Sequence, residues 1–204
     1  MTKIKLCGLK RVCDIEWANE LQPDYVGFVF ARQSKRYVTG KEAEKLRAML
    51  HKPVKAVGVF VNEEPEVIAA LTRQRTIDMV QLHGNEDEAY LRRLRGMTGV
   101  PVIQAFRVKT REDIQRAEKS SADIVLLDSG SGGGKTFDWD LLQDMKRPYF
   151  LAGGLTPKNV ADAIERLRPF GVDTSSCLET EGVKDKRKMA AFVEAVRRKE
   201  IKDE

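Results

Sequence analysis

Eight short runs rich in apolar and β-branched residues recur along the chain at intervals of roughly 20 to 30 residues. Each run is followed by a charged stretch in which apolar residues recur at three- and four-residue spacing, as in an amphipathic helix. Runs such as YVGFVF and IVLLD are almost entirely apolar, which is typical of parallel strands covered on both faces. We predict strands at residues 4–7, 25–30, 56–61, 79–83, 102–106, 124–128, 149–153 and 172–175.

The stretches between these runs carry helix signals. Thr39 is a suitable N-cap for a helix at 41–50, and prolines predict helices that begin at Pro65 and near Pro157. Further helices are predicted at 89–94, 111–119 and 186–198. No Gly/Ser linker or composition shift divides the chain, so residues 1–204 are expected to form a single domain.

Eight strand–helix units favour an α/β fold of the closed (β/α)8 type, a TIM barrel at the small end of its size range. The alternative is a doubly wound open sheet, in which a GxGxxG signature often follows the first strand of a dinucleotide site. Cys7, Gly8, Leu9 and Lys10 stand at that place instead. The number of units is what favours the barrel.

Composition and charge narrow the range of partners. The net charge is +5, but the basic residues are interspersed with acids, as at 184–188 and 197–202, so no nucleic-acid partner is expected. No apolar run approaches the roughly 18 residues that span a bilayer, and the N-terminal segment lacks the apolar centre of a signal peptide. We expect no membrane association and a cytoplasmic location. The three cysteines are not spaced as a metal clamp, so reduced thiols and no metal are expected.

Polar residues gather where the predicted strands end, which is where TIM barrels carry their reactive groups. The side chains expected at this rim include Cys7, Arg36, His83 and Asp128. Asp128 opens a Gly-rich segment, 128–136, that lacks the GxxxxGK[ST] form of a nucleotide P-loop. Two interpretations of that segment stay open: a loop that closes over a ligand and an inert connection.

The last two strands lead into residues suited to binding a phosphate. Gly153 and Gly154 bring backbone N–H groups close to a ligand, and a helix that begins near Pro157 would favour an anion. Ser175 and Ser176 add hydroxyl and amide donors in the sector where barrels often bind phosphate. The alternative is that the glycines only form a tight turn. The modest positive charge also suits an anionic small molecule.

Several motifs follow one another along the chain. They are KLCGL (5–9), DYVGFVF and SKR (24–30 and 34–36), VGVFVN (57–62), VQLHGNE (80–86), LLDS and GGGKTFDW (126–129 and 132–139), LAGGLTPKNV (151–160) and VDTSSCLETEGVKD (172–185). Together these motifs resemble those of the phosphoribosylanthranilate isomerase family of tryptophan biosynthesis. This resemblance implies a TIM barrel and an isomerase that acts without a cofactor on a phosphorylated sugar derivative.

The resemblance also assigns roles to individual residues. It implies that Cys7 is a general base, that Asp128 is a general acid and that Arg36 holds the carboxylate of the anthranilate. From its place at a strand end, His83 is expected to contact the substrate, and a structural hydrogen bond to a loop is the alternative. Phosphate binding is expected of the loop residues Gly153, Gly154, Ser175, Ser176 and Cys177. The substrate would undergo an Amadori rearrangement to 1-(o-carboxyphenylamino)-1-deoxyribulose 5-phosphate.

Cys177 departs from the family pattern, which has glycine at this point of the loop. A Cβ there is expected to strain a positive φ or to crowd the phosphate. Other phosphate-binding barrels, such as ribulose-phosphate epimerase and indole-glycerol-phosphate synthase, are alternative activities, but their metal-binding aspartates or their lysine and glutamate set do not appear here. A binding protein that has lost its activity is the non-enzymatic alternative. The protein is expected to be a monomer or a homodimer.

Overall fold

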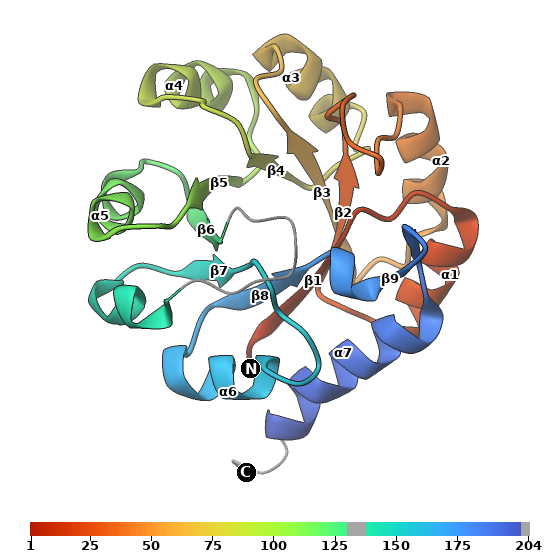
Figure 1. The fold of residues 1–204 in the computed structure, drawn as a ribbon. Helices are drawn as coiled ribbons and strands as arrows, with labels where there is room; N and C mark the ends of the chain where they lie inside the picture. Colours follow the sequence, from red (N-terminus) through yellow and green to blue (C-terminus); the bar gives the residue numbers. More distant parts are fainter. Residues whose placement is uncertain (130–137, 201–204) are drawn as a thin grey trace.

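The computed structural model describes residues 1–129 and 138–200, which form a closed barrel of eight parallel strands (Figure 1). Each strand pairs with the next, and β8 closes on β1 in a register that runs from Lys3 opposite Gly171 to Leu6 opposite Thr174. The predicted TIM barrel is confirmed. The strands are β1 (Lys3–Cys7), β2 (Tyr25–Val29), β3 (Lys55–Phe60), β4 (Met79–Leu82), β5 (Val102–Arg107), β6 (Ile124–Asp128), β7 (Tyr149–Leu151) and β8 (Gly171–Thr174).

Seven α-helices in the described residues surround the barrel (Figure 1). The predicted cap at Thr39 is present: its hydroxyl accepts a hydrogen bond from the Glu42 amide, and the Glu42 carboxylate accepts one from the Thr39 amide. The last helix packs against the first and the sixth. The helices are α1 (Val12–Leu21), α2 (Gly40–Met49), α3 (Pro65–Arg73), α4 (Glu88–Met97), α5 (Arg111–Lys119), α6 (Val160–Leu167) and α7 (Lys186–Glu200).

Two connections differ from the predicted pattern. Between β6 and β7 the described residues form a short 3-10 helix, η1 (Trp139–Asp144), and most of the Gly-rich segment predicted there, 130–137, lies outside the described residues. The helix predicted to begin near Pro157 begins at Val160. The Asn159 side chain accepts from the Thr156 amide at 2.7 Å and donates to the Gly154 carbonyl at 3.0 Å, so Pro157 lies in a turn that precedes the helix.

A small addition follows β8 and was not predicted. It consists of a 3-10 turn, η2 (Ser176–Leu178), and an antiparallel ribbon of β9 (Glu179–Thr180) and β10 (Val183–Lys184). In this ribbon Lys184 lies opposite Glu179, and paired residues of adjacent strands project to the same face. The Arg11 guanidinium donates to the Lys184 carbonyl, which ties the ribbon to the start of α1.

The apolar core has two parts that follow from the two-residue period of the strands. Outward residues such as Leu6 and Phe28 pack under the helices. Inward residues fill the barrel with a fully apolar layer: Val57, Met79, Ile103, Leu126, Phe150 and Ala152. On β1 the inward positions are Lys5 and Cys7, and Cys7 packs with Val29 and Val59. Reactive side chains therefore lie above the apolar layer, at the carboxyl ends of the strands.

Candidate active site

A cavity of about 720 Å³ opens at the carboxyl ends of the strands. Its walls come from the ends of β1 to β4 and β6 to β8 and from the loops that follow them. Every site residue expected from the sequence lies on this one cavity. These residues are Cys7, Arg36, His83, Asp128, Gly153, Gly154, Ser175, Ser176 and Cys177.

Cys7 is the last residue of β1, and its thiol is almost fully buried, with 8% of the residue exposed. Gly27 on β2 makes room for it, because a Cβ at Gly27 would lie 2.6 Å from the Cys7 sulfur. Burial raises the pKa of the Cys7 thiol, and the charges of Lys5 and Lys184 lower that pKa without cancelling the rise. The thiol is therefore predominantly protonated in the free protein near neutral pH.

Lys5 is a fully buried lysine on the inner wall of the barrel, two residues before Cys7. Its ammonium forms an ion pair of 2.8 Å with Asp173, which stands opposite it in the β1–β8 register. Burial alone would lower the pKa of Lys5, but Asp173 and Cys7 together outweigh burial and raise it. Lys5 is therefore a permanent cation beneath the thiol.

Asp128 ends β6 on the same cavity and is about a quarter exposed. His83 lies beside it, with 3.6 Å between the His83 Nε2 and the Asp128 Oδ2. The buried Gln81 side chain forms a hydrogen bond of 2.9 Å between its Nε2 and the His83 Nδ1, and so fixes the orientation of the imidazole ring. The carboxylate at the end of β6 therefore lies beside a ring that is held in place.

The loops after β7 and β8 approach the site closely. Gly153 and Gly154 have φ of 82° and 69°, the left-handed region that glycine adopts without strain. A Cβ at Gly153 would lie 2.6 Å from an oxygen of Asp128, so the loop touches the carboxylate. The Ser175 hydroxyl donates to the Cys7 carbonyl at 2.9 Å, which fastens the loop after β8 to the end of β1.

Cys177 stands in η2 without the backbone strain expected for it, because its φ is not positive. Its sulfur contacts the Thr174 hydroxyl oxygen at 3.0 Å, and the side chain packs against the outer core. The expectation of a strained positive φ is wrong, since the loop here forms a 3-10 turn that any L-residue adopts. Burial raises the pKa of this thiol.

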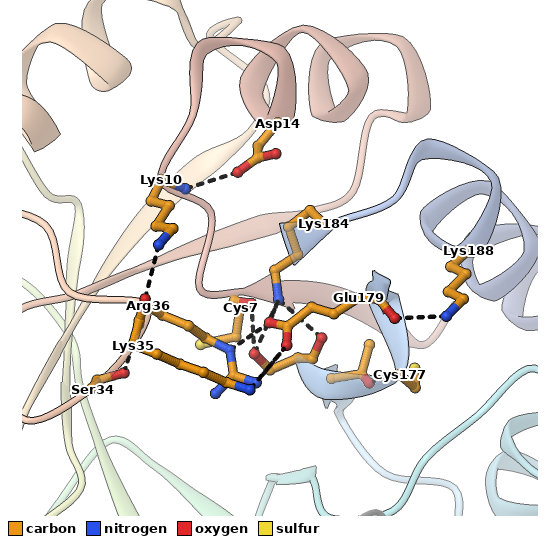
Figure 2. A network of polar contacts seen from close by, with 12 residues as sticks. Cys7, Lys10, Asp14, Ser34, Lys35, Arg36, Cys177, Glu179, Lys184 and Lys188 are labelled. Atoms are coloured by element: carbon orange, nitrogen blue, oxygen red, sulfur yellow. Dashed lines mark hydrogen bonds and ion pairs between the residues drawn. The ribbon is translucent and has the colours of Figure 1, made fainter. Parts of the chain in front are cut away.

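Arg36 is held by a carboxylate that the sequence analysis did not assign to the site (Figure 2). Its Nε donates to the Glu179 Oε1 at 2.5 Å, and its Nη2 donates to the Oε2 at 2.9 Å. The Lys184 ammonium donates to the same carboxylate at 2.8 Å and to the Ser175 carbonyl at 2.9 Å. Gly8 makes this arrangement possible, because a Cβ there would overlap the Arg36 side chain.

Four further residues of the site had no assigned role in the sequence prediction. Gln81 and Asp173 line the cavity, whereas Glu179 and Lys184 lie behind Arg36. Gln81 and Asp173 could have been predicted from the two-residue period of strands. Gln81 projects to the same face as His83, and Asp173 projects to the same face as Ser175. Glu179 and Lys184 have no such signal, since their ribbon strands are only two residues long.

Among residues 1–129 and 138–200, no group of three or more His, Cys, Asp or Glu side chains is arranged to hold a metal ion. Within the same described residues, no helix is long and apolar enough to cross a membrane. The cavity instead joins a thiol, a carboxyl group and a guanidinium group to two loops rich in Gly and Ser. Such a set can bind an anionic small molecule and transfer protons.

Comparison with known proteins places this architecture in one family. The family model described as N-(5'phosphoribosyl)anthranilate (PRA) isomerase matches residues 4–195. A relative of that name from Endomicrobium trichonymphae is 46% identical over 202 residues, which covers 97% of this chain and 99% of the relative. Another, from Thermoanaerobacter sp. (strain X514), is 43% identical over 204 residues, with 97% and 98% covered.

Solved structures lead to the same family as the sequence comparisons. Phosphoribosylanthranilate isomerase from Thermotoga maritima is 38% identical and superposes with a TM-score of 0.89, covering 97% of this chain and 99% of the other. A second isomerase structure, in complex with reduced 1-(o-carboxyphenylamino)-1-deoxyribulose 5-phosphate, is 37% identical with a TM-score of 0.87 at the same coverage. With the fold, the rim cavity and both comparisons in agreement over nearly its whole length, the chain belongs to the N-(5'-phosphoribosyl)anthranilate isomerase family.

Proposed function

We propose that the chain converts N-(5-phosphoribosyl)anthranilate to 1-(o-carboxyphenylamino)-1-deoxyribulose 5-phosphate, with Cys7 as general base and Asp128 as general acid. As a member of its family the chain is an isomerase of tryptophan biosynthesis. The observation that carries the assignment of roles is the shared cavity, which has Cys7, Asp128 and Arg36 on its walls together with the loops after β7 and β8.

The proposed substrate has an anion at each end, and the cavity offers donors for both. Arg36 suits the planar carboxylate, because a guanidinium donates two parallel hydrogen bonds to it. The backbone amides of Gly153, Gly154, Ser175, Ser176 and Cys177 and the hydroxyl of Ser176 suit the phosphate. The related isomerase that was solved with the reduced product supports this use of the site, since that ligand carries the same two anions.

Asp128 and Cys7 each carry out one proton transfer in the proposed reaction, and a tautomerisation completes it. Asp128 gives its proton to the ring oxygen of the ribose, the ring opens, and the nitrogen lone pair forms an iminium at C1'. Cys7 then removes the proton from C2', and the resulting enolamine tautomerises to the ketone. His83 contacts Asp128 and is proposed to orient its carboxyl group.

At neutral pH an aspartate that must act as an acid is mostly ionised, and a buried thiol that must act as a base is mostly protonated. A free aspartate, with a pKa near 3.9, is protonated in only about one molecule in a thousand at neutral pH. The Cys7 thiol has the reverse difficulty, because burial raises its pKa and leaves little thiolate. Lys5 and Lys184 favour the thiolate, and the iminium of the substrate adds a third positive charge beside it.

The proposed activity is tested by following the fluorescence of the anthranilate group while purified protein turns over N-(5-phosphoribosyl)anthranilate. We expect a loss of signal with the wild-type chain and none with a Cys7→Ser, Asp128→Asn double variant. If the wild-type protein leaves the fluorescence unchanged, the proposed reaction is wrong.

We also propose that the protein is a monomer or a homodimer and that it works in the cytoplasm. A related Thermotoga maritima isomerase, 38% identical with a TM-score of 0.86, is described as dimeric, with monomers generated from it. The three free cysteines support a reducing compartment. Light scattering should give one or two times the chain mass of 23.1 kDa, and a larger species would contradict the proposal.

A further inference from the structure

Arg36 stands between the cavity and a buried pair of opposite charges (Figure 2). Its side chain is 21% exposed, whereas those of Glu179 and Lys184 are 6% and 2% exposed. The Glu179 carboxylate accepts hydrogen bonds from Arg36 and Lys184, and of these three residues only Arg36 lines the cavity. The carboxylate therefore acts on the site through Arg36.

The geometry of the Arg36–Glu179 pair leaves one edge of the guanidinium open. Glu179 engages the edge formed by Nε and Nη2, at 2.5 and 2.9 Å. Within the described residues, Nη1 makes no hydrogen bond. A guanidinium has five N–H donors in a fixed plane, so a second carboxylate can bind the edge formed by Nη1 and Nη2 in a bidentate manner.

The charges of the network keep Arg36 attractive to an anion. Glu179 alone would neutralise Arg36, but Lys184 lies 2.8 Å from the same carboxylate and the exposed Lys35 lies 3.9 Å from it, so these cations outnumber the carboxylate. Burial alone would raise the pKa of Glu179, but hydrogen bonds from Arg36 and Lys184 outweigh burial and lower it. Glu179 is therefore ionised and Arg36 retains its attraction for a second carboxylate.

From this geometry we infer that Glu179 is a positioning residue that orients Arg36 toward the aromatic carboxylate of the substrate and so contributes to substrate specificity. The inference rests on the proposed function, in which Arg36 binds that carboxylate. Lys184 extends the network to the loop after β8, because its ammonium also contacts the carbonyl and the hydroxyl oxygen of Ser175. One buried network thus joins the proposed carboxylate site to the proposed phosphate loop.

The test compares two stable ligands and needs no turnover. One is the reduced product, 1-(o-carboxyphenylamino)-1-deoxyribulose 5-phosphate after reduction, and the other is the same compound with phenyl in place of o-carboxyphenyl. Their dissociation constants are measured by calorimetry for the wild-type chain, Glu179→Gln, Arg36→Met and the control Glu181→Gln. Glu181 is an exposed residue in the turn of the same ribbon, and its substitution should leave both constants unchanged.

For Glu179→Gln we expect binding of the carboxylated ligand to weaken on the order of tenfold, while binding of the phenyl ligand changes less than about twofold. In turnover the same variant should raise KM and leave kcat within about threefold of the wild type. Equal weakening of both ligands, or no weakening of either, would overturn the inference. If Glu179→Gln does not fold, Glu179→Asp replaces it; the shorter carboxylate should also weaken the carboxylated ligand selectively.

The Arg36→Met variant separates this inference from the proposed function. If Arg36→Met selectively weakens the carboxylated ligand but Glu179→Gln does not, only the positioning role of Glu179 is refuted. If Arg36→Met weakens both ligands equally, the carboxylate site at Arg36 is wrong, and the inference about Glu179 is refuted with it.

Discussion

Replacing Gly153 with alanine would test how closely the loop after β7 must approach the proposed acid. Gly153 has a φ of 82°, where an L-residue costs about 1–2 kcal/mol. The new Cβ would also lie 2.5 Å from the Ser129 amide nitrogen and 2.6 Å from an oxygen of Asp128. Because the nitrogen belongs to the backbone, a side-chain rotation alone does not relieve the contact.

The size of the effect follows from those distances. The Asp128 oxygen must move away by about 0.8 Å to pass from 2.6 Å to ordinary contact at 3.4 Å. A displacement of about 1 Å at a catalytic group can cost about 100-fold in rate. That loss corresponds to about 2.7 kcal/mol in activation free energy. The conformational cost of 1–2 kcal/mol should in addition lower the melting temperature by about 2–8 °C.

The assay measures kcat, KM and thermal unfolding for Gly153→Ala and for Gly96→Ala. Gly96 lies in α4, and a Cβ there meets nothing within 4 Å, so this control should keep full activity and equal or slightly higher stability. For Gly153→Ala we expect a fall in kcat on the order of 100-fold in protein that is still folded. A Gly153→Ala enzyme with near-normal kcat would refute the argument that this loop and the acid share the same space.

Three further outcomes follow from the site. Cys7→Ser and Asp128→Asn should each lower kcat by two or more orders of magnitude and change KM little, as expected of proton-transfer groups; near-full kcat in either variant would remove its assigned role. Since burial raises the pKa of Cys7 and the thiolate is the base, the residual kcat/KM of Asp128→Asn, which lacks the opposing ionisation of the acid, should rise from about pH 6 to about pH 9, and a flat profile in that variant would contradict the thiolate base. Cys177→Gly should leave KM within about twofold but lower stability by about 1 kcal/mol, because its sulfur contacts Thr174 and the outer core; a much lower KM would instead show that Cys177 crowds the phosphate.

The barrel and the nine cavity residues could be predicted because the sequence features that indicate them lie within short segments of the chain. Each strand is a short apolar run, and eight of the nine site residues lie within three positions of a strand end, whereas Arg36 lies seven positions beyond β2. Helix boundaries were less accurate where a side chain competes with the helix. At Pro157, the sequence suggested a first helical turn, but Asn159 bonds both Thr156 and Gly154 and delays the helix to Val160.

The buried ion pairs depend on contacts that the linear sequence does not show. A lysine in a strand ordinarily faces water, and Lys5 is buried only because the closure of β8 on β1 brings Asp173 beside it. Glu179 and Lys184 meet across a ribbon of two residues on each side, too short to have a periodic pattern. Such pairs appear only when the register between strands is known.

The balance of these buried charges bears on how the proposed base works. Lys5 is paired with Asp173, and Lys184 is paired with Glu179, which also binds Arg36. Arg36 is the further cation that this network presents to the cavity, and it faces the proposed substrate carboxylate. Both lysines lower the pKa of the Cys7 thiol, but the loss of hydration on burial outweighs them, so this pKa stays raised. We infer that the base gains its strength from the substrate: once the iminium forms next to the buried sulfur, its positive charge stabilises the thiolate and acidifies the C2' hydrogen in the same step.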